Sequence, residues 1–296
     1  MSGARRELLV ERAGPLTTVQ DAGRSGVAHL GVPPSGAADR GAFGLANRLV
    51  GNAVTAAALE VTLGGLVLRP ADDVVVAVTG AACPVTVDGR SVGRNAVLQV
   101  PGGARLALGT ASAGLRAYLA VRGGLAVAPV LGSRSTDLLS GLGPPPLVDG
   151  DVLPIGELVD GWPRVDQAPV AEPTGGPVLL RAVPGPRADW LTGDGLARLW
   201  SSTWTVAADS NRVGLRLQAG GVRLERSRTG ELASEGLIRG AVQVPPSGEP
   251  VLFLADHPVT GGYPVAAVVI ARDADLAGQV RPGQQVRFVA VPAPPI

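Results

Sequence analysis

The sequence predicts a mainly β protein in two parts, with a few short helices. After Glu60, short Val-rich runs are separated by Gly, Pro and Asp at close spacing, which is typical of a β-sandwich or β-barrel. Only 3% of the residues are aromatic, so Val, Leu, Ala and Ile must build the core, which favours short strands over long helices. A Pro- and Gly-rich stretch from Asp160 to Pro177 predicts a linker. We therefore expect domains at 1–165 and 166–296.

The first part is expected to begin with two strands and a helix. Leu8–Val10 and Thr17–Val19 predict strands, the second of which enters a turn at Asp21. Asp39 is a suitable cap for a helix that ends at Gly51-Asn52, and a second short helix is expected over Val54–Leu59. Further strands are expected at 66–68, 74–78, 85–87, 96–100, 106–108 and 115–121, with a type I′ hairpin at Asp88-Gly89.

The second part repeats features of the first. The run 178–181, followed by Gly185-Pro186, echoes the run 8–11, followed by Gly14-Pro15. Strands are expected near 215–217 and 251–254, and helices at 193–200 and 273–280. The pentapeptide Val-Pro-Pro-Ser-Gly at 32–36 recurs at 244–248. This repetition favours an internal duplication with an insertion in one half.

Composition and charge exclude several classes of function. The net charge is +1 and the arginines are scattered, so no basic face for nucleic acid is expected. The apolar stretches are shorter than a membrane span and no signal-peptide core is apparent, which predicts a cytoplasmic protein that does not enter the membrane. The single cysteine, Cys83, follows an apolar run and is expected to be buried and inert.

The chain contains no lysine. A Walker phosphate loop, a Schiff base and covalent biotin each need a lysine amine, so none of these is expected on this chain. The sequence has no G-x-S-x-G, G-x-G-x-x-G or C-x-x-C motif, and its two His residues are far apart. No metal site is therefore expected.

Asp21, Arg24 and His29 lie in a Gly-flanked loop that suits chemistry. Arg24 offers a planar fork for a carboxylate or phosphoryl oxygen, while Asp21 or His29 would orient or transfer a proton. Alternatively, Asp21 and Arg24 pair with each other to fix the turn. Ser35 and Asp39 are better explained as a turn residue and a helix cap.

Other candidates follow along the chain. Asn47 points away from the apolar face of its helix, where its amide would polarise a substrate carbonyl or would simply be solvated, and Arg48 follows it. Arg134 and Ser135 lie in a loop where a guanidinium and hydroxyls would converge on an anion. A loop held by its own hydrogen bonds is the alternative.

Several motifs carry a resemblance to a known family. They appear in this order from near the first residue to near the last: GPLTTVQDAGRSG (14–26), HLGVPPSGAAD (29–39), ANRLVGN (46–52), ALEVTLGG (58–65), YLAVRGG (118–124), LGSRST (131–136), SNRVGLRL (210–217), ELASEGLIRGAVQVPPSGEP (231–250) and TGGYP (260–264). With these motifs the chain resembles the biotin-dependent carboxyltransferase subunit family, which includes KipA, the C-type subunit of 5-oxoprolinase and proteins of the allophanate hydrolase subunit 2 type. Ala38 and the pair His257-Pro258 depart from the residues that many relatives have.

The resemblance implies two cyclophilin-like β-barrel domains and a KipI-like companion, which corresponds to the B-type subunit of 5-oxoprolinase, with the site formed where the two proteins meet. A third subunit of the LamB/YcsF type is also compatible. The resemblance, more than local chemistry, marks Asn211, Arg212 and Glu235 as binding residues. Thr260 and Tyr263 flank a Gly-Gly pair that forms either a binding loop or a tight turn.

Three hypotheses of function follow. The first is a subunit of an ATP-dependent 5-oxoprolinase, a hydrolase that opens the cyclic amide of 5-oxoproline to glutamate, with ATP and Mg²⁺ held partly by the companion. The second is transfer of a carboxyl group from biotin, on a separate carrier, to urea or a related amide. The third is a non-enzymatic module that sequesters a KipI-like kinase inhibitor.

Overall fold

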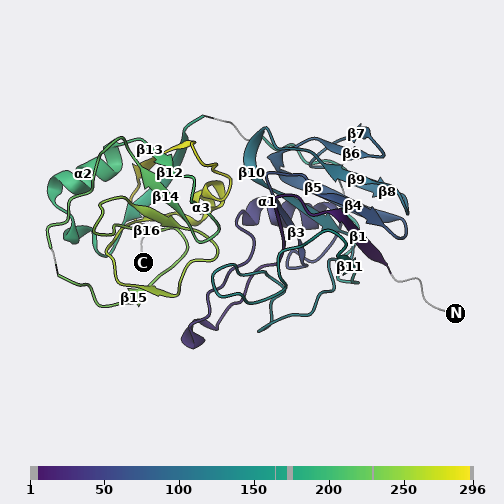
Figure 1. The fold of residues 1–296 in the computed structure, drawn as a ribbon, viewed down its shortest axis with the longest axis horizontal. Helices are drawn as coiled ribbons and strands as arrows, with labels where there is room; N and C mark the ends of the chain where they lie inside the picture. Colours follow the sequence, from purple (N-terminus) through teal and green to yellow (C-terminus); the bar gives the residue numbers. More distant parts are fainter. Residues whose placement is uncertain (1–5, 164, 172–175, 229, 294–296) are drawn as a thin grey trace. The chain divides into compact units, whose positions relative to one another are not determined.

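The computed structural model describes residues 6–163, 165–171, 176–228 and 230–293, and these group into two compact units (Figure 1). The first unit contains the residues up to Arg24, Ser35–Asp137 and the segment from Gly141 to Ala171. The second contains Ser25–Pro34, Leu138–Ser140 and the residues from Gly176 onward. Both units are built mainly from strands, so the predicted mainly β fold is confirmed.

The first unit contains two sheets. One has the order β11-β1-β4-β9-β6-β7 and the other β2-β3-β10-β5-β8. The strands are β1 (Glu7–Arg12), β2 (Leu16–Gln20), β3 (Ala58–Thr62), β4 (Val67–Pro70), β5 (Val74–Ala82), β6 (Val85–Val87), β7 (Arg90–Val92), β8 (Val97–Val100), β9 (Leu106–Leu108), β10 (Ala113–Val121) and β11 (Val152–Pro154). All pairs within the two sheets are antiparallel.

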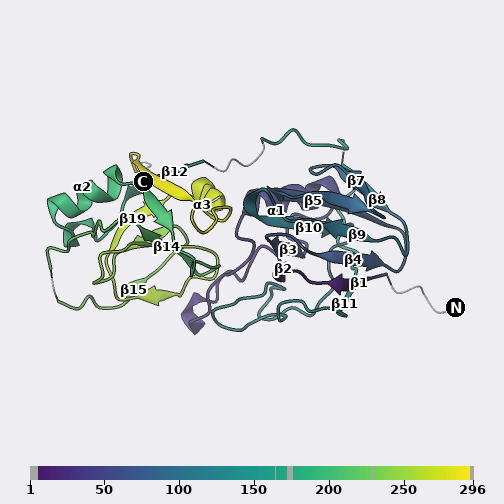
Figure 2. The ribbon, with the colours of Figure 1, turned by 45° about the horizontal axis from the view of Figure 1, so that its top comes forward.

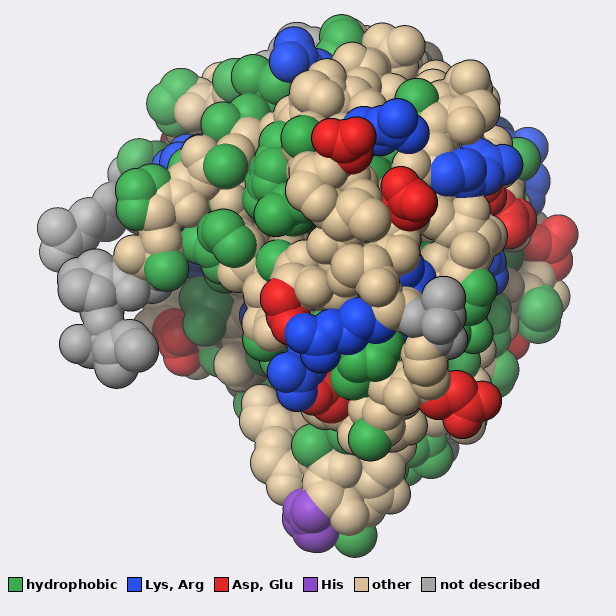
Figure 3. Space-filling view, turned by 90° about the vertical axis from the view of Figure 1, so that its left-hand side faces the viewer, with side chains coloured by type: hydrophobic (Ala, Val, Ile, Leu, Met, Phe, Trp, Pro, Cys, Tyr) green, Lys and Arg blue, Asp and Glu red, His purple; other side chains and the backbone are tan. Residues whose placement is uncertain are grey.

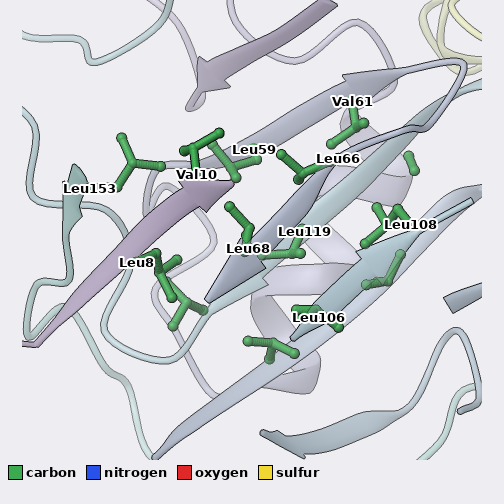
Figure 4. Close-up of a cluster of buried hydrophobic side chains, with 14 of the residues drawn as sticks. Leu8, Val10, Leu59, Val61, Leu66, Leu68, Leu106, Leu108, Leu119 and Leu153 are labelled. Atoms are coloured by element: carbon green, nitrogen blue, oxygen red, sulfur yellow. The ribbon is translucent and has the colours of Figure 1, made fainter. Parts of the chain in front are cut away.

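The core of this unit lies between the two sheets. Because side chains alternate along a strand, one face of each sheet supplies apolar residues to this core (Figure 4). Leu8 and Val10 of β1 pack there with Leu59 of β3 and Leu119 of β10. Cys83 belongs to the same cluster, and burial raises the pKa of its thiol, which confirms the expectation of a buried cysteine.

The opposite face of the second sheet is covered by helix α1 (Arg40–Leu49) (Figure 2). The Asp39 carboxylate accepts a hydrogen bond from the amide of Ala42 at 2.9 Å, so the predicted cap is confirmed. Phe43 packs against Tyr118 of β10 in an edge-to-face contact. The second helix expected over Val54–Leu59 is wrong: the chain turns there and enters β3 at Ala58, so that Ala58 and Leu59 pair with β2, and Leu59 also pairs with β10.

The second unit contains a closed barrel with the order β12-β19-β16-β17-β14-β13-β20 (Figure 1). The strands are β12 (Val178–Pro184), β13 (Trp204–Val206), β14 (Gly214–Gln218), β15 (Glu235–Gly236), β16 (Ala241–Gln243), β17 (Val251–Phe253), β18 (Thr260–Gly261), β19 (Val265–Val269) and β20 (Gln285–Ala290). β15 and β18 form a separate two-stranded ladder. Helix α2 (Gly193–Ser201) is close to its expected position, whereas α3 (Ala271–Ala277) begins and ends earlier than expected.

Two turn predictions have different outcomes. Asp88 and Gly89 both have positive φ between β6 and β7, as a type I′ hairpin requires. The two Val-Pro-Pro-Ser-Gly copies differ, because Ser35 is buried with a φ of 52° whereas Ser247 is exposed and has no positive φ. Identical letters therefore form different local structures in the two units.

The segment after the last strand of the first unit remains bound to that unit. The amide of Val97 donates to the carbonyl of Asp166, and the amide of Ala168 donates to the carbonyl of Asn95, both at 2.8 Å. The domain boundary expected between 165 and 166 therefore falls inside a segment that pairs with the first unit. Among the described residues, no helix has the length and apolarity needed to cross a bilayer.

Candidate functional site

The Asp21 carboxylate is buried and fully occupied by hydrogen bonds within the first unit. One oxygen accepts from the hydroxyls of Ser133 and Ser135 at 2.6 Å and from the amide of Gly23 at 2.8 Å, and the other accepts from the amide of Arg134 at 2.6 Å. Asp21 therefore joins the turn after β2 to the loop around residue 134. This arrangement suits a structural anchor, since a general base needs an accessible oxygen.

Arg24, Arg134 and Ser135 belong to the same cluster. Arg24 is 2% exposed and donates from Nε to the carbonyl of Val130 at 3.1 Å and from its terminal nitrogen to the carbonyl of Ser135. Arg134 donates from Nε to the carbonyl of Val127 at 2.8 Å. Both guanidinium groups thus hold loop carbonyls, as in the alternative of a loop fixed by its own hydrogen bonds.

Asn47 is buried, so the alternative of a solvated side chain is wrong. Its amide nitrogen donates to the carbonyl of Ala56 at 2.8 Å, and its oxygen accepts from Asn52 at 2.9 Å. Asn52 in turn donates to the carbonyl of Val121. The side chain points away from the apolar face as expected, but the chain after α1 folds back over it. The exposed Arg48 side chain lies along its own helix, with Nη1 3.1 Å from where a Cβ on Gly44 would lie.

His29 lies in the short 3-10 helix η1 (Ala28–Leu30), none of whose residues is buried. Its Nδ1 is 3.1 Å from the carbonyl oxygen of Gly26. By residue contacts this segment groups with the second unit, whereas Asp21 and Arg24 group with the first.

In the second unit, Arg212 and Glu235 each form an ion pair. Arg212 is 1% exposed and binds the Asp256 carboxylate with two hydrogen bonds, at 2.9 and 2.8 Å. The half-buried Glu235 accepts hydrogen bonds from Arg187, which lower the pKa of its carboxyl. Glu235 pairs in register with Gly261, next to the exposed Thr260.

A pocket of about 410 Å³ lies on the outer wall of the barrel. The inward side chains of β14 and β17, such as Leu215 and Leu252, fill the barrel core, and the alternate residues Arg216 and Phe253 face outward into the pocket. Its volume lies within the range of about 300–1,000 Å³ typical of small-molecule sites. The apolar lining comes from Leu139, Val213, Pro245, Val251 and Phe253.

Four polar side chains line the same pocket: Asn211, Arg216, Gln243 and Tyr263. Asn211 and Tyr263, both expected as binding residues, are therefore brought together here. The pocket also receives Gln243 and Arg216, which sequence reasoning missed. The sequence did contain a signal for both, because each lies within a motif that carries the family resemblance and alternates with apolar residues of its strand.

Arg212 supports this pocket rather than lining it. The Asp256 carboxylate that binds Arg212 also accepts from the amide of Leu138 at 3.1 Å, next to the pocket residue Leu139. Asn211 precedes Arg212 in the chain, and its side-chain oxygen accepts from the amide of Val213 at 2.8 Å. The departure at His257 is also structural, because this buried ring bonds the carbonyl of Pro258 at 2.8 Å.

No group of three or more His, Cys, Asp or Glu side chains among the described residues is placed to hold a metal ion. On the face drawn in Figure 3, acidic and basic side chains lie interspersed. The geometry thus defines a mainly β protein whose second unit is a closed barrel with a pocket of small-molecule size on its outer wall.

Comparison with known proteins places this chain in a family. Residues 30–290 match the family described as carboxyltransferase domain, subdomain A and B. The chain is 41% identical over 290 residues to the C-type subunit of 5-oxoprolinase from Escherichia coli K12, covering 95% of this chain and 90% of that protein. It is 35% identical to the Haemophilus influenzae protein of the same name, covering 93% and 88%. The chain therefore belongs to the carboxyltransferase domain family, as its motifs predicted.

A solved structure has the same fold. The K. lactis urea amidolyase superimposes with a TM-score of 0.92 at 31% identity, and the match covers 99% of this chain and 19% of that one. The chain thus spans about a fifth of that polypeptide.

Proposed function

We propose that this chain is the C-type subunit of an ATP-dependent 5-oxoprolinase and opens 5-oxoproline to glutamate with a KipI-like companion, the B-type subunit. The observation that carries this proposal is the 41% identity across 95% of this chain and 90% of the E. coli protein. Two chains that correspond over nearly their whole lengths are suited to the same place in an assembly. The pocket on the barrel supplies a site of suitable size.

The proposed chemistry explains why ATP is needed. The lactam carbonyl is resonance-stabilised and resists water, so transfer of the terminal phosphoryl group of ATP to the lactam oxygen activates it. Water then attacks the carbonyl carbon, the ring C–N bond breaks as the nitrogen takes a proton, and an acyl phosphate remains. A second water hydrolyses this acyl phosphate to the carboxylate of glutamate and free phosphate. Because the chain has no lysine, arginines or the companion hold the phosphates, with Mg²⁺ as counter-ion.

Carboxyl transfer from biotin is a second candidate, and the TM-score of 0.92 to the K. lactis urea amidolyase favours it. The biotin must then come from a separate carrier protein, because this chain has no lysine to which biotin could be attached. The amide acceptor is urea or a related compound. A third function, sequestration of a KipI-like inhibitor, would use contacts with the companion but needs no turnover.

The test is ATP turnover by the chain co-purified with its companion subunits, including a LamB/YcsF-type protein. We expect 5-oxoproline to stimulate ATP hydrolysis in step with glutamate formation, and omission of this chain to abolish both. Urea and a biotinylated carrier are supplied in parallel reactions. Turnover with urea that requires the carrier, and none with 5-oxoproline, contradicts the proposal in favour of carboxyl transfer. Binding of the companion without turnover of either substrate favours sequestration.

A further inference from the structure

Arg216 and Gln243 lie on either side of one apolar residue on the outer barrel wall. In the strand register, Val251 of β17 pairs with Arg216 of β14 and with Gln243 of β16. Adjacent strands are about 4.8 Å apart, so the Arg216 and Gln243 backbones are separated by roughly twice that spacing. All three residues line the pocket. A cation and an amide therefore flank an apolar floor that is the width of a small ring.

The Gln243 side chain is oriented before any ligand binds. It is 4% exposed, and its Nε2 donates to the backbone carbonyl of Tyr263 at 2.9 Å. This bond fixes which end of the amide is the oxygen. Among the residues that the structure describes, none donates to Oε1, which is left as an acceptor for a ligand N–H. A ligand that covers Oε1 must supply this donor, because it would otherwise leave a polar atom without a hydrogen bond.

Arg216 has a partner that a ligand can replace. Its ion pair with Asp209, at 2.9 Å, joins side chains that are 62% and 67% exposed. Such a pair contributes little to stability in water, so its guanidinium can exchange Asp209 for a ligand carboxylate that is better enclosed. Asp209 is the acidic group that competes with the ligand for this site.

The other side of the pocket supplies donors. Asn211 uses its Oδ1 to accept the amide of Val213, which leaves its Nδ2 as a donor, and the Tyr263 hydroxyl is a second donor. Together the lining offers donors for a carbonyl oxygen, an acceptor for an N–H, a cation for a carboxylate and an apolar floor for methylene groups.

We propose that this pocket binds a cyclic amide that bears a carboxylate, with Gln243 Oε1 accepting the lactam N–H and Arg216 binding the carboxylate. This inference rests on the proposed function and names the residues that select its substrate. In 5-oxoproline the ring nitrogen and the carboxylate are attached to the same carbon, so the side chains of Gln243 and Arg216 would reach this part of the ligand from either side of Val251. Urea has no carboxylate with which Arg216 could form an ion pair.

The experiment measures binding of 5-oxoproline to the full chain, alone and with its companions, by calorimetry without ATP. Arg216→Met is expected to raise the Kd about tenfold. It should leave the Kd of 2-pyrrolidinone, which lacks the carboxylate, unchanged. The matched control is Arg223→Met, since Arg223 is also exposed and paired, with Glu249 at 2.9 Å, but does not line the pocket.

A second variant tests the N–H contact. The wild type is expected to bind 5-oxoproline at least about tenfold more tightly than its N-methyl derivative. Gln243→Met should remove that preference. Thermal unfolding of this variant is the control that it is still folded. Equal effects of Arg216→Met and Arg223→Met, or an unchanged preference in Gln243→Met, overturn the inference.

The inference and the proposed function fail in different ways. Turnover of 5-oxoproline that neither pocket variant affects overturns the inference and leaves the proposed function. Selective binding that both variants weaken, with no turnover by the complete assembly, supports the inference and overturns the proposed function. Absence of both binding and turnover overturns both.

Discussion

The loop cluster of the first unit and the barrel pocket of the second use polar residues in opposite ways. Asp21 accepts four hydrogen bonds from its own chain, and Arg24 and Asn47 bind backbone carbonyls. Around the pocket, by contrast, Gln243 retains an acceptor and Tyr263 is 46% exposed. The family motifs thus contain polar side chains that are engaged within the chain and others that can still bind a ligand, and we expect the second kind to form the binding site. The predictions below test this distinction.

The largest loss of stability is expected for Arg212→Met. Arg212 and Asp256 are 1% and 0% exposed at their side chains, so removal of the arginine leaves a buried carboxylate without its cation. Such a change costs about 3–5 kcal/mol. Urea unfolding of the variant should show a lower midpoint.

The double variant Arg212→Met, Asp256→Leu is the control for this prediction. Because both charges are removed, it should recover a large part of the loss. A double variant no more stable than the single one would show that packing, rather than the unpaired charge, accounts for the effect.

Asp21→Asn is expected to cost about 2–3 kcal/mol. The amide has the same shape, but its nitrogen replaces one of the two accepting oxygens. The Arg134 amide loses its acceptor if the nitrogen takes the Oδ2 position, and the Ser133 hydroxyl loses its acceptor if the nitrogen takes the Oδ1 position. The measurement is again urea unfolding, now paired with the Kd of 5-oxoproline at a temperature where the variant is folded.

If Asp21 is an anchor, that Kd and the turnover of the folded assembly stay close to the wild type. A turnover reduced a hundredfold or more without loss of stability would instead make Asp21 a catalytic group. Arg134→Ala is the neighbouring control, because it removes the bond to the Val127 carbonyl but keeps the backbone amide that donates to Asp21.

Gly261→Ala should have a small effect on stability and a larger one on binding. A Cβ at this position would lie 2.7 Å from Gln243 Nε2 and 2.7 Å from a methyl carbon of Leu237, so the flexible amide must move. We expect a loss of about 1 kcal/mol in the free energy of unfolding, at the low end for overpacking, because the displaced groups are the ends of flexible side chains.

The displaced amide should also lose its orientation toward the ligand. The preference for 5-oxoproline over its N-methyl derivative, measured by calorimetry, should therefore fall in Gly261→Ala. Gly262→Ala is the control, because its nearest neighbour is the Leu232 carbonyl at 3.3 Å. A preference that Gly261→Ala leaves intact would contradict the role given to Gln243.

Local signals in the sequence were sufficient for much of the fold. The Asp39 cap, the Asp88-Gly89 hairpin and most strands depend on neighbours a few residues away, and the structure confirms them. The helix expected over Val54–Leu59 was wrong because pairing with β2 and β10 overrides local propensity. Tertiary contacts, which a local pattern does not contain, decided that segment.

The candidate site was less predictable for the same reason. Asp21 meets Ser133 and Ser135, more than a hundred residues away, and only those contacts show that its oxygens are occupied. Asn47 lies on the expected side of α1. Its burial depends on the loop that follows the helix, where the Ala56 carbonyl accepts a hydrogen bond from the Asn47 side chain. Gln243 lies beside Tyr263 on the outer face of the barrel because the strands pair in this closed order, which the sequence does not reveal.

The smallest effect on stability is expected for His29→Gln. The ring lies in the exposed η1 segment, and its Nδ1 approaches the Gly26 carbonyl at 3.1 Å. The free energy of unfolding should change by less than about 0.5 kcal/mol, as is usual for exposed positions. For the complete assembly we expect kcat within twofold of the wild type across pH 6–8, because the pocket proposed to bind the substrate is lined by other residues. A fall of a hundredfold in kcat without loss of stability would instead assign proton transfer to His29. That result would place part of the site on an exposed segment outside the pocket. Hydrogen bonding within the chain would then distinguish structural from functional polar side chains only where those side chains are buried.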